Sequence, residues 1–120
     1  MKILIVEDNE DNLYLLEFLL KRKGYEVVVA RDGLEGVKKA LNEKPSLILM
    51  DIQLPQMNGY EATQEIRKNV NMMETPIIAV TSFAMPNDRQ KCLDSGCTDY
   101  LEKPIDPETF FNSIEKYLSK

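Results

Sequence analysis

The chain has 120 residues, of which 43% are hydrophobic and 29% charged, and its formal net charge is −5. This length and composition are typical of one globular domain with a single core, here residues 1–120, and the acidic balance argues against direct nucleic-acid binding. The apolar runs are too short to span a membrane and the charged start does not resemble a signal peptide, so we expect a cytoplasmic protein without membrane contact.

Two residue types limit the chemistry further. Histidine is absent, which excludes Ser-His-Asp and Cys-His nucleophilic sites and requires any phosphohistidine donor to be another protein. The spacing of Cys92 and Cys97 fits neither a redox pair nor a zinc site. We therefore expect both cysteines to be reduced packing residues.

Short apolar runs alternate with amphipathic stretches along the whole chain. The predicted strands cover residues 2–7, 26–30, 47–51, 77–81 and 99–102. The first, third and fourth are almost continuously apolar, as expected of strands covered by helices on both faces. The repeated strand–helix pattern predicts an α/β fold built on a parallel sheet.

Helical periodicity places three helices in the first part of the chain. The first begins near Asn9 and ends before Gly24, the second covers residues 34–42, and the third follows Asn58-Gly59. The side chains expected to face the core are Leu13, Leu16 and Leu20, then Val37, Ala40 and Leu41, then Ala62 and Ile66.

Two further helices complete the pattern. The fourth starts near Pro86 and ends at Ser95-Gly96, and the fifth follows Asp106 with Pro107 in its first turn. The fifth helix is expected to bury Phe111, Ile114 and Leu118. We interpret the remaining helical rings as core or helix-face residues rather than as a cofactor site; these are Tyr14, Phe18, Phe110 and Tyr117.

Acidic residues lie at the ends of two of the apolar strands. Glu7 and Asp8 follow the first strand, and Asp51 ends the third. If these strands are neighbours in a parallel sheet, each like-charge pair costs about 4 kcal/mol near a protein surface. A bound Mg²⁺, with Mn²⁺ as a substitute, would relieve this repulsion and leave room for phosphate oxygens. The pattern therefore predicts a metal-dependent phosphate site.

Other strand ends supply groups suited to phosphate chemistry. The carboxylate of Asp51 can accept a phosphoryl group and form an acyl phosphate. Thr81 ends the fourth strand, where its hydroxyl could donate to a phosphoryl oxygen, and Lys103 follows the last strand as a compact positive charge. Taken alone, Thr81 and Lys103 are each explained as well by an ordinary structural role.

Together these segments resemble the receiver domain of bacterial two-component response regulators over essentially the whole chain. The matching segments are Glu7-Asp8, residues 50–59, Thr81-Ser82 and residues 100–104. The resemblance implies a flavodoxin-like (βα)5 fold with a five-stranded parallel sheet of order 2-1-3-4-5 and helices on both faces.

The resemblance also implies roles for individual residues. Asp51 would receive the phosphoryl group from a sensor histidine kinase or a histidine phosphotransfer protein. Mg²⁺ would be held by Asp8, Asp51 and the backbone carbonyl of Gln53, with Glu7 assisting through water.

The remaining site residues would act as a switch. Thr81 and Lys103 would contact the phosphoryl group, the Lys103–Pro104 bond is typically cis in the family, and Tyr100 would turn inward as Thr81 moves.

The downstream partner would bind the surface of the fourth helix, fifth strand and fifth helix. Residues expected on that surface are Ser82, Phe83, Ala84, Met85, Tyr100 and Ile105. We also hypothesise that the bulk of Phe83 limits water access and lengthens the life of the phosphorylated state. On this reading the chain is not a turnover enzyme but a phosphoacceptor switch that catalyses only its own phosphorylation and dephosphorylation.

Other readings remain open. The chain resembles single-domain phosphorelay receivers, but a receiver excised from a hybrid kinase or multidomain regulator would share these features. A docking module without phosphorylation is disfavoured by the presence of Asp8, Asp51, Thr81 and Lys103. A flavodoxin-like mononucleotide binder is disfavoured by the acidic segment at residues 7–11, which would repel phosphate. An aspartate-nucleophile phosphatase would carry an Asp-x-Asp pattern after its first strand, where this chain has Glu7-Asp8-Asn9.

Overall fold

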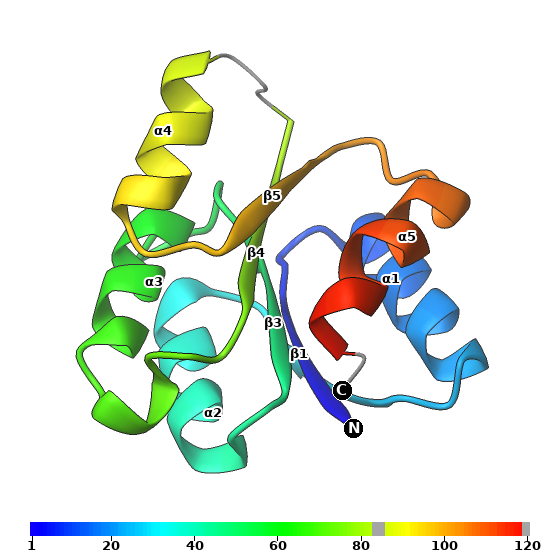
Figure 1. The fold of residues 1–120 in the computed structure, drawn as a ribbon, viewed down its shortest axis with the longest axis horizontal. Helices are drawn as coiled ribbons and strands as arrows, with labels where there is room; N and C mark the ends of the chain where they lie inside the picture. The colour runs from blue at the N-terminus through cyan, green and yellow to red at the C-terminus, as the bar shows by residue number, and fades with distance from the viewer. Residues whose placement is uncertain (83–85, 119–120) are drawn as a thin grey trace.

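The computed structural model describes residues 1–82 and 86–118 (Figure 1). Its five strands are β1 (Lys2–Val6), β2 (Glu26–Ala30), β3 (Leu47–Asp51), β4 (Ile77–Thr81) and β5 (Asp99–Glu102). All neighbouring strands pair in parallel, in the order β2-β1-β3-β4-β5. The predicted flavodoxin-like sheet is therefore confirmed.

Four helices connect successive strands, a fifth follows the last strand, and together they cover both faces of the sheet. They are α1 (Glu10–Arg22), α2 (Gly33–Glu43), α3 (Gly59–Arg67), α4 (Pro86–Asp94) and α5 (Pro107–Leu118). Helices α1 and α5 lie on one face, and α2, α3 and α4 lie on the other (Figure 1). The helices cover the two faces of the sheet and leave the ends of the parallel strands uncovered.

Successive side chains of β1 point to opposite faces of the sheet and belong to two separate hydrophobic cores. Ile3 and Ile5 pack with the leucines of α1 and with α5, whereas Leu4 and Val6 pack with α2 and α3. Because successive strand residues point to opposite faces, a strand covered on both sides must be apolar throughout. All four of these side chains are fully buried.

Polar caps define where the first three helices begin. The side chains of Asn9, Asp32 and Asn58 each accept a hydrogen bond from the backbone N–H three residues later. At α3, the Glu61 side chain also accepts from the Asn58 N–H at 3.1 Å, which completes a capping box. The caps fix where each helix starts: α1 and α2 begin shortly after β1 and β2, whereas a loop of residues 52–58 separates β3 from α3.

Some predicted boundaries and the predicted burial of Phe111 were wrong, whereas Ile114 and Leu118 are buried as expected. Strand β1 ends at Val6 rather than Glu7, α2 extends one residue beyond its predicted range at each end, and a short 3₁₀ helix, η1 (Val70–Met72), was not foreseen. In α5, Phe110 is 1% exposed whereas Phe111 is only partly buried. The rotation of α5 about its axis is set by how it packs on the sheet, and two adjacent phenylalanines leave that rotation ambiguous in the sequence.

The other packing predictions are confirmed. Cys92 and Cys97 are free thiols and both are buried. Tyr14 and Phe18 stack on each other on the outer face of α1, with ring centroids 6.3 Å apart. In the part of the chain that the structure describes, no helix is both long and apolar enough to cross a bilayer.

Candidate functional site at the carboxyl ends of the strands

The predicted acidic residues meet at one edge of the sheet. Strands β1 and β3 are neighbours, with Val6 opposite Met50, so Glu7 and Asp8 emerge beside Asp51. One carboxylate oxygen from each of the three acids lies within 4.8 Å of the others. Parallel pairing of two strands that are distant in the sequence therefore creates the cluster.

Burial differs sharply among the three acids. The exposed fractions of Glu7 and Asp51 are 1% and 3%, whereas Asp8 is exposed. The Asp51 Oδ1 atom accepts a hydrogen bond of 3.3 Å from the Gln53 N–H, and Glu7 Oε2 accepts one of 3.2 Å from the Asn9 N–H. The backbone after each strand thus orients the carboxylate at its end.

Lys103 brings a positive charge to the buried pair. Its Nζ atom lies 3.1 Å from Glu7 Oε1 and 3.4 Å from Asp51 Oδ1. Burial, together with the adjacent Asp51, raises the pKa of Glu7 to about 7, although Lys103 and the Asn9 N–H act in the opposite direction. Desolvation and like-charge repulsion therefore outweigh the attraction of the single lysine.

The donor set fits a hard divalent cation. Glu7 Oε1 is buried and makes no well-aligned hydrogen bond within the described residues, even though Lys103 Nζ is close. An unsatisfied buried oxygen beside two further carboxylates is the arrangement that Mg²⁺ or Mn²⁺ would complete, since these ions prefer oxygen ligands. The cluster of Glu7, Asp8 and Asp51 can therefore hold a metal.

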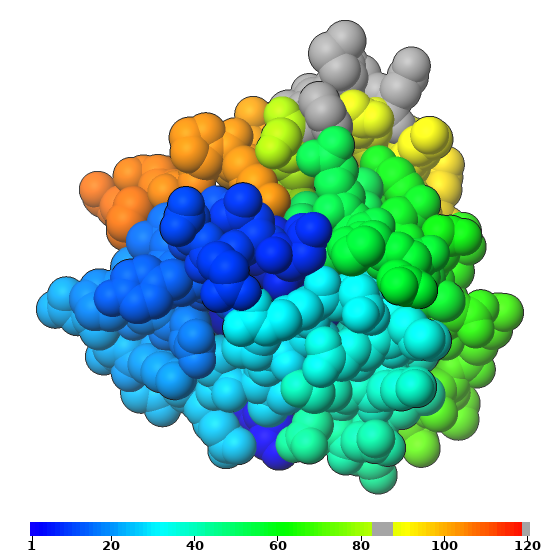
Figure 2. All heavy atoms as spheres, turned by 180° about the vertical axis from the view of Figure 1, so that it is seen from behind, coloured from blue at the N-terminus to red at the C-terminus, as the bar shows by residue number. Residues whose placement is uncertain are grey.

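An open cleft of about 360 Å³ gives access to the cluster. It is lined by five of the predicted site residues, Glu7, Asp8, Asp51, Gln53 and Lys103. On the face shown in Figure 2, the blue N-terminal segment meets the green and orange segments, which follow β3 and β5 in the chain. The cleft is therefore assembled from several separate parts of the chain.

Three neutral residues also line the cleft, namely Asn9, Asn12 and Ser82. None of them was predicted as a site residue from the sequence. Ser82 follows Thr81 at a strand end, so the expectation that site residues lie at the carboxyl ends of parallel strands also applies to it. Asn12 lies in the first turn of α1 and carries no such signal, because its backbone N–H bonds to the Asn9 cap in the way that any helix start requires.

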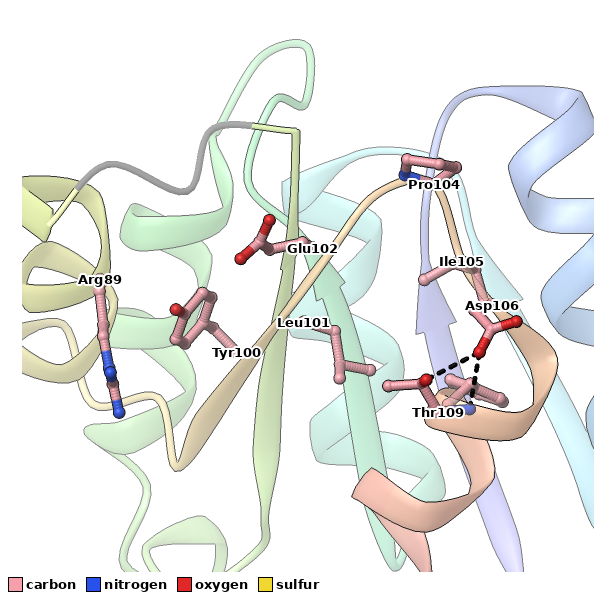
Figure 3. A pocket seen from close by; sticks show the side chains of 9 residues that line it. Arg89, Tyr100, Leu101, Glu102, Pro104, Ile105, Asp106 and Thr109 are labelled. Carbon is pink, nitrogen blue, oxygen red and sulfur yellow. Dashed lines mark hydrogen bonds between the residues drawn. The ribbon is translucent and has the colours of Figure 1, made fainter.

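The predicted switch residues Thr81 and Tyr100 are not among the residues that line the cleft. Thr81 is 2% exposed at the end of β4, and its carbonyl accepts a 2.8 Å hydrogen bond from the Lys103 N–H. Tyr100 instead lines a separate cavity with Arg89, whose guanidinium carbon lies 5.2 Å from the centre of the Tyr100 ring (Figure 3). The Lys103–Pro104 peptide bond is cis, as the resemblance implied.

A glycine packs directly against the backbone of Asp51. A Cβ atom at Gly59 would lie 2.3 Å from the Asp51 carbonyl oxygen and 2.8 Å from the Ile52 Cα atom. The Gly59 N–H also donates to the Ile52 carbonyl at 2.9 Å. The start of α3 therefore supports the backbone at Asp51, which explains why a glycine follows the Asn58 cap.

Three predicted surface residues, Phe83, Ala84 and Met85, lie outside the described residues. The hypothesis about Phe83 and hydrolysis therefore stays a prediction. Ser82 is exposed, and Tyr100 and Ile105 are partly buried.

Comparisons with known proteins agree with the fold and the acidic cluster. Residues 3–115 match the family model of the response regulator receiver domain. The polar-differentiation response regulator DivK of Brucella anthropi is 42% identical over 116 residues, covering 97% of this chain and 94% of DivK.

Solved structures give the same result. The receiver domain of the sensor histidine kinase PA1611 from Pseudomonas aeruginosa, which has a magnesium ion in its active-site cleft, is 39% identical with a TM-score of 0.92, covering 99% of this chain and 98% of that one. The chemotaxis protein CheY4 of Vibrio cholerae is 31% identical with a TM-score of 0.92, covering 97% of each chain. From its sequence match, sheet order and strand-end acids, the chain belongs to the response regulator receiver domain family.

Proposed function

We propose that the protein receives a phosphoryl group on Asp51 and changes its affinity for a partner protein in response. One observation carries the proposal: the Asp51 carboxylate is nearly buried at an open cleft, beside two acids and 3.4 Å from Lys103 Nζ. Acyl-phosphate formation needs a positioned carboxylate and charge stabilisation, and this cleft offers both.

The donor in this proposal is a phosphohistidine on a sensor histidine kinase or a histidine phosphotransfer protein. This chain has no histidine of its own, so the phosphohistidine would lie on another protein. A carboxylate oxygen of Asp51 attacks the phosphorus atom, the new O–P bond forms, and the N–P bond of the donor breaks. The leaving imidazole keeps the electron pair and takes up a proton. Later attack by water on the acyl phosphate releases inorganic phosphate and restores Asp51.

Asp8, Asp51 and the backbone carbonyl of Gln53 would hold Mg²⁺, with Glu7 contributing through water. When bound, Mg²⁺ supplies positive charge that offsets the charge of the transferring group. Mn²⁺ would serve in its place, since it also prefers octahedral oxygen ligands. The magnesium ion in the PA1611 receiver, a 39% identical relative, supports this assignment.

Lys103 and Thr81 would bind the phosphoryl oxygens. Lys103 is held near Asp51 by its contact with Glu7, and Thr81 ends the strand adjacent to Asp51. A phosphoryl group adds nearly two negative charges and several acceptor oxygens, so the loops that carry both residues would be drawn toward it. Because Lys103 N–H bonds to Thr81 O at 2.8 Å, the two strand ends would move together.

This movement would reach the surface formed by α4, β5 and α5. Tyr100 lies between Arg89 of α4 and the strand, while Leu101 points toward the α5 side (Figure 3). The cavity there is also lined by Ile105 and Thr109. We propose that Tyr100 repositions when Thr81 moves and that the downstream protein binds this surface.

The protein would act as a switch rather than as a turnover enzyme. Its similarity to DivK, over 94% of that regulator, supports signalling through protein contact. Similarity to the PA1611 receiver supports the alternative in which the domain serves a hybrid kinase. Phosphotransfer from purified phosphorylated kinases and phosphotransfer proteins, compared by initial rate, would distinguish the two.

The acceptor assignment is tested by mass spectrometry of the intact protein after incubation with acetyl phosphate and Mg²⁺. The wild type should gain one phosphoryl group, and both Asp51→Asn and omission of Mg²⁺ should prevent the gain. Asp11→Asn, which removes an exposed acid of α1, is the matched control and should be labelled normally. Labelling of Asp51→Asn at the wild-type rate would overturn the assignment.

A further inference from the structure

The turn after α4 brings the two cysteines of the chain together. Gly96 has a φ of +109°, its N–H donates to Leu93 O, and the Cys97 N–H donates to Cys92 O, both at 3.0 Å. These two bonds form a Schellman motif, in which the residue after the glycine packs against the residue five positions earlier. Cys92 and Cys97 are 0% and 6% exposed and share one core cluster.

Arg67, at the end of α3, holds this turn in place. Its guanidinium donates to Gly96 O at 2.9 Å, and also to Met72 O at 2.6 Å and Thr75 O at 2.7 Å. A further contact of 3.3 Å reaches the Thr98 hydroxyl. One side chain therefore joins the end of α4 to η1 and to the segments that lead into β4 and β5.

The remainder of α4 is held weakly. Among the side chains of α4 that the structure describes, Cys92 is the one that is buried, whereas α1 buries four leucines. Arg89 and Lys91 contact the Tyr100 and Tyr60 rings at 5.2 and 5.7 Å, which are modest interactions at an exposed surface. A helix with so little buried apolar surface belongs to the regions of a protein that open first.

Burial in the folded structure also keeps both thiols unreactive. Burial raises the pKa of Cys92, and it raises the pKa of Cys97 to about 12. The thiolate is the reactive form of cysteine, so little of it is present near neutral pH while the thiols stay buried. Exposure to water would restore ordinary cysteine reactivity.

We propose that α4 and the turn through Thr98 open as a local unit latched by Arg67, and that Cys92 and Cys97 form a concealed thiol site open to modification only when the latch releases. The reagent class is a soft electrophile. The thiolate sulfur forms a bond to carbon, the carbon–halogen bond of the reagent breaks, halide leaves, and the thiol proton passes to solvent.

The test is the rate of alkylation by iodoacetamide, measured by intact mass in the Cys92→Ala and Cys97→Ala variants, so that each remaining thiol is followed alone. With the latch intact, labelling should be slower than in the urea-unfolded chain and independent of urea below the unfolding transition. Arg67→Met should accelerate labelling at both cysteines by roughly 10- to 100-fold, the factor expected from losing a hydrogen bond to a charged group.

Two controls keep the result specific. Lys68→Met removes a neighbouring exposed charge and should label at the wild-type rate. Arg67→Lys keeps the charge but cannot reach three carbonyls, so its rate should fall between those of the wild type and Arg67→Met. The rate of amide exchange in β1 reports global unfolding. In each of these variants it should change by a smaller factor than the rate of thiol labelling does.

Three results would overturn the proposal. The first is labelling that follows the urea dependence of global unfolding, and the second is an Arg67→Met rate equal to that of the wild type. The third is fast labelling of Cys97 regardless of residue 67, which would mean that this thiol is directly accessible.

Discussion

Lys103 Nζ lies closer to Glu7 Oε1, at 3.1 Å, than to Asp51 Oδ1, at 3.4 Å. The only described cation at the cleft is therefore shared between the proposed acceptor and a second, more deeply buried carboxyl group. Any gain of positive charge at the cleft would reduce the repulsion between Glu7 and Asp51 and release Lys103 for the phosphoryl group.

The first prediction concerns pH. The pKa of Glu7 is about 7 in the folded protein against 4.5 for an unperturbed glutamate, so the folded state binds more protons than the unfolded state between these values. Stability should therefore fall as pH rises from about 4.5 to about 7, by at most roughly 3 kcal/mol. Urea unfolding in metal-free buffer across this range measures how the free energy of unfolding changes with pH.

Glu7→Gln provides the matched variant for this measurement, since it keeps the shape but cannot ionise. Its stability should depend less on pH in the same window and should exceed that of the wild type above pH 7. Equal slopes for the two proteins would show that Glu7 is not the titrating group.

The second prediction concerns metal. Mg²⁺ that binds only the folded site stabilises the protein by about 1.4 kcal/mol at a tenfold excess over its dissociation constant. The thermal midpoint at pH 7.5 should rise with Mg²⁺ or Mn²⁺ and return on addition of chelator. Asp8→Asn should remove this response, while Asp11→Asn, on an exposed acid, should retain it. A midpoint that does not respond to metal in the wild type would contradict the site.

The third prediction concerns the glycine behind the acceptor. In Gly59→Ala the new methyl group would meet the Asp51 carbonyl oxygen, so the backbone at Asp51 must shift. We expect a loss of roughly 1–3 kcal/mol in unfolding free energy and slower labelling by acetyl phosphate.

Gly33→Ala separates the loss of stability from the slower labelling by acetyl phosphate. Its Cβ would clash with the carbonyl oxygen of Met57 rather than with the backbone of Asp51, so it should lose stability but retain labelling once folded. If both variants were labelled at the same rate, packing behind Asp51 would have no part in positioning the acceptor.

The fourth prediction concerns the buried face of α5. Phe110 is 1% exposed and Phe111 is partly buried, so Phe110→Ala should cost about 3–5 kcal/mol and Phe111→Ala clearly less. Urea unfolding of the two variants is the measurement. A larger loss for Phe111→Ala would support the face expected from the sequence alone.

Local sequence signals predicted most of the secondary structure. Continuous apolar runs marked β1, β3 and β4, and helical periodicity placed the starts of α1 and α3 near Asn9 and after Asn58-Gly59, where the structure shows both asparagines as caps. These features succeed because an apolar run and a helix cap are patterns of residues that are close in the chain. The 3₁₀ helix η1 was missed because three residues carry no usable period.

The site residues at strand ends were also predictable, because in a parallel sheet the carboxyl ends share one edge. Glu7, Asp8, Asp51, Gln53 and Lys103 line one cleft as expected. Tyr100 and Thr81 lie outside that lining, and the switch roles proposed for them depend on a movement that strand positions alone do not describe.

The sequence by itself determined the alternation of strands and helices, the apolar character of the central strands and the chemical identity of the acidic site. Only the tertiary structure decided the depth at which Glu7 is buried, its contact with Lys103, which of the two adjacent phenylalanines of α5 packs inward and the bonds of Arg67 to the end of α4. The physical reason is range: hydrogen bonding and periodicity act between near neighbours, whereas burial and ion pairing depend on how distant segments pack around the sheet.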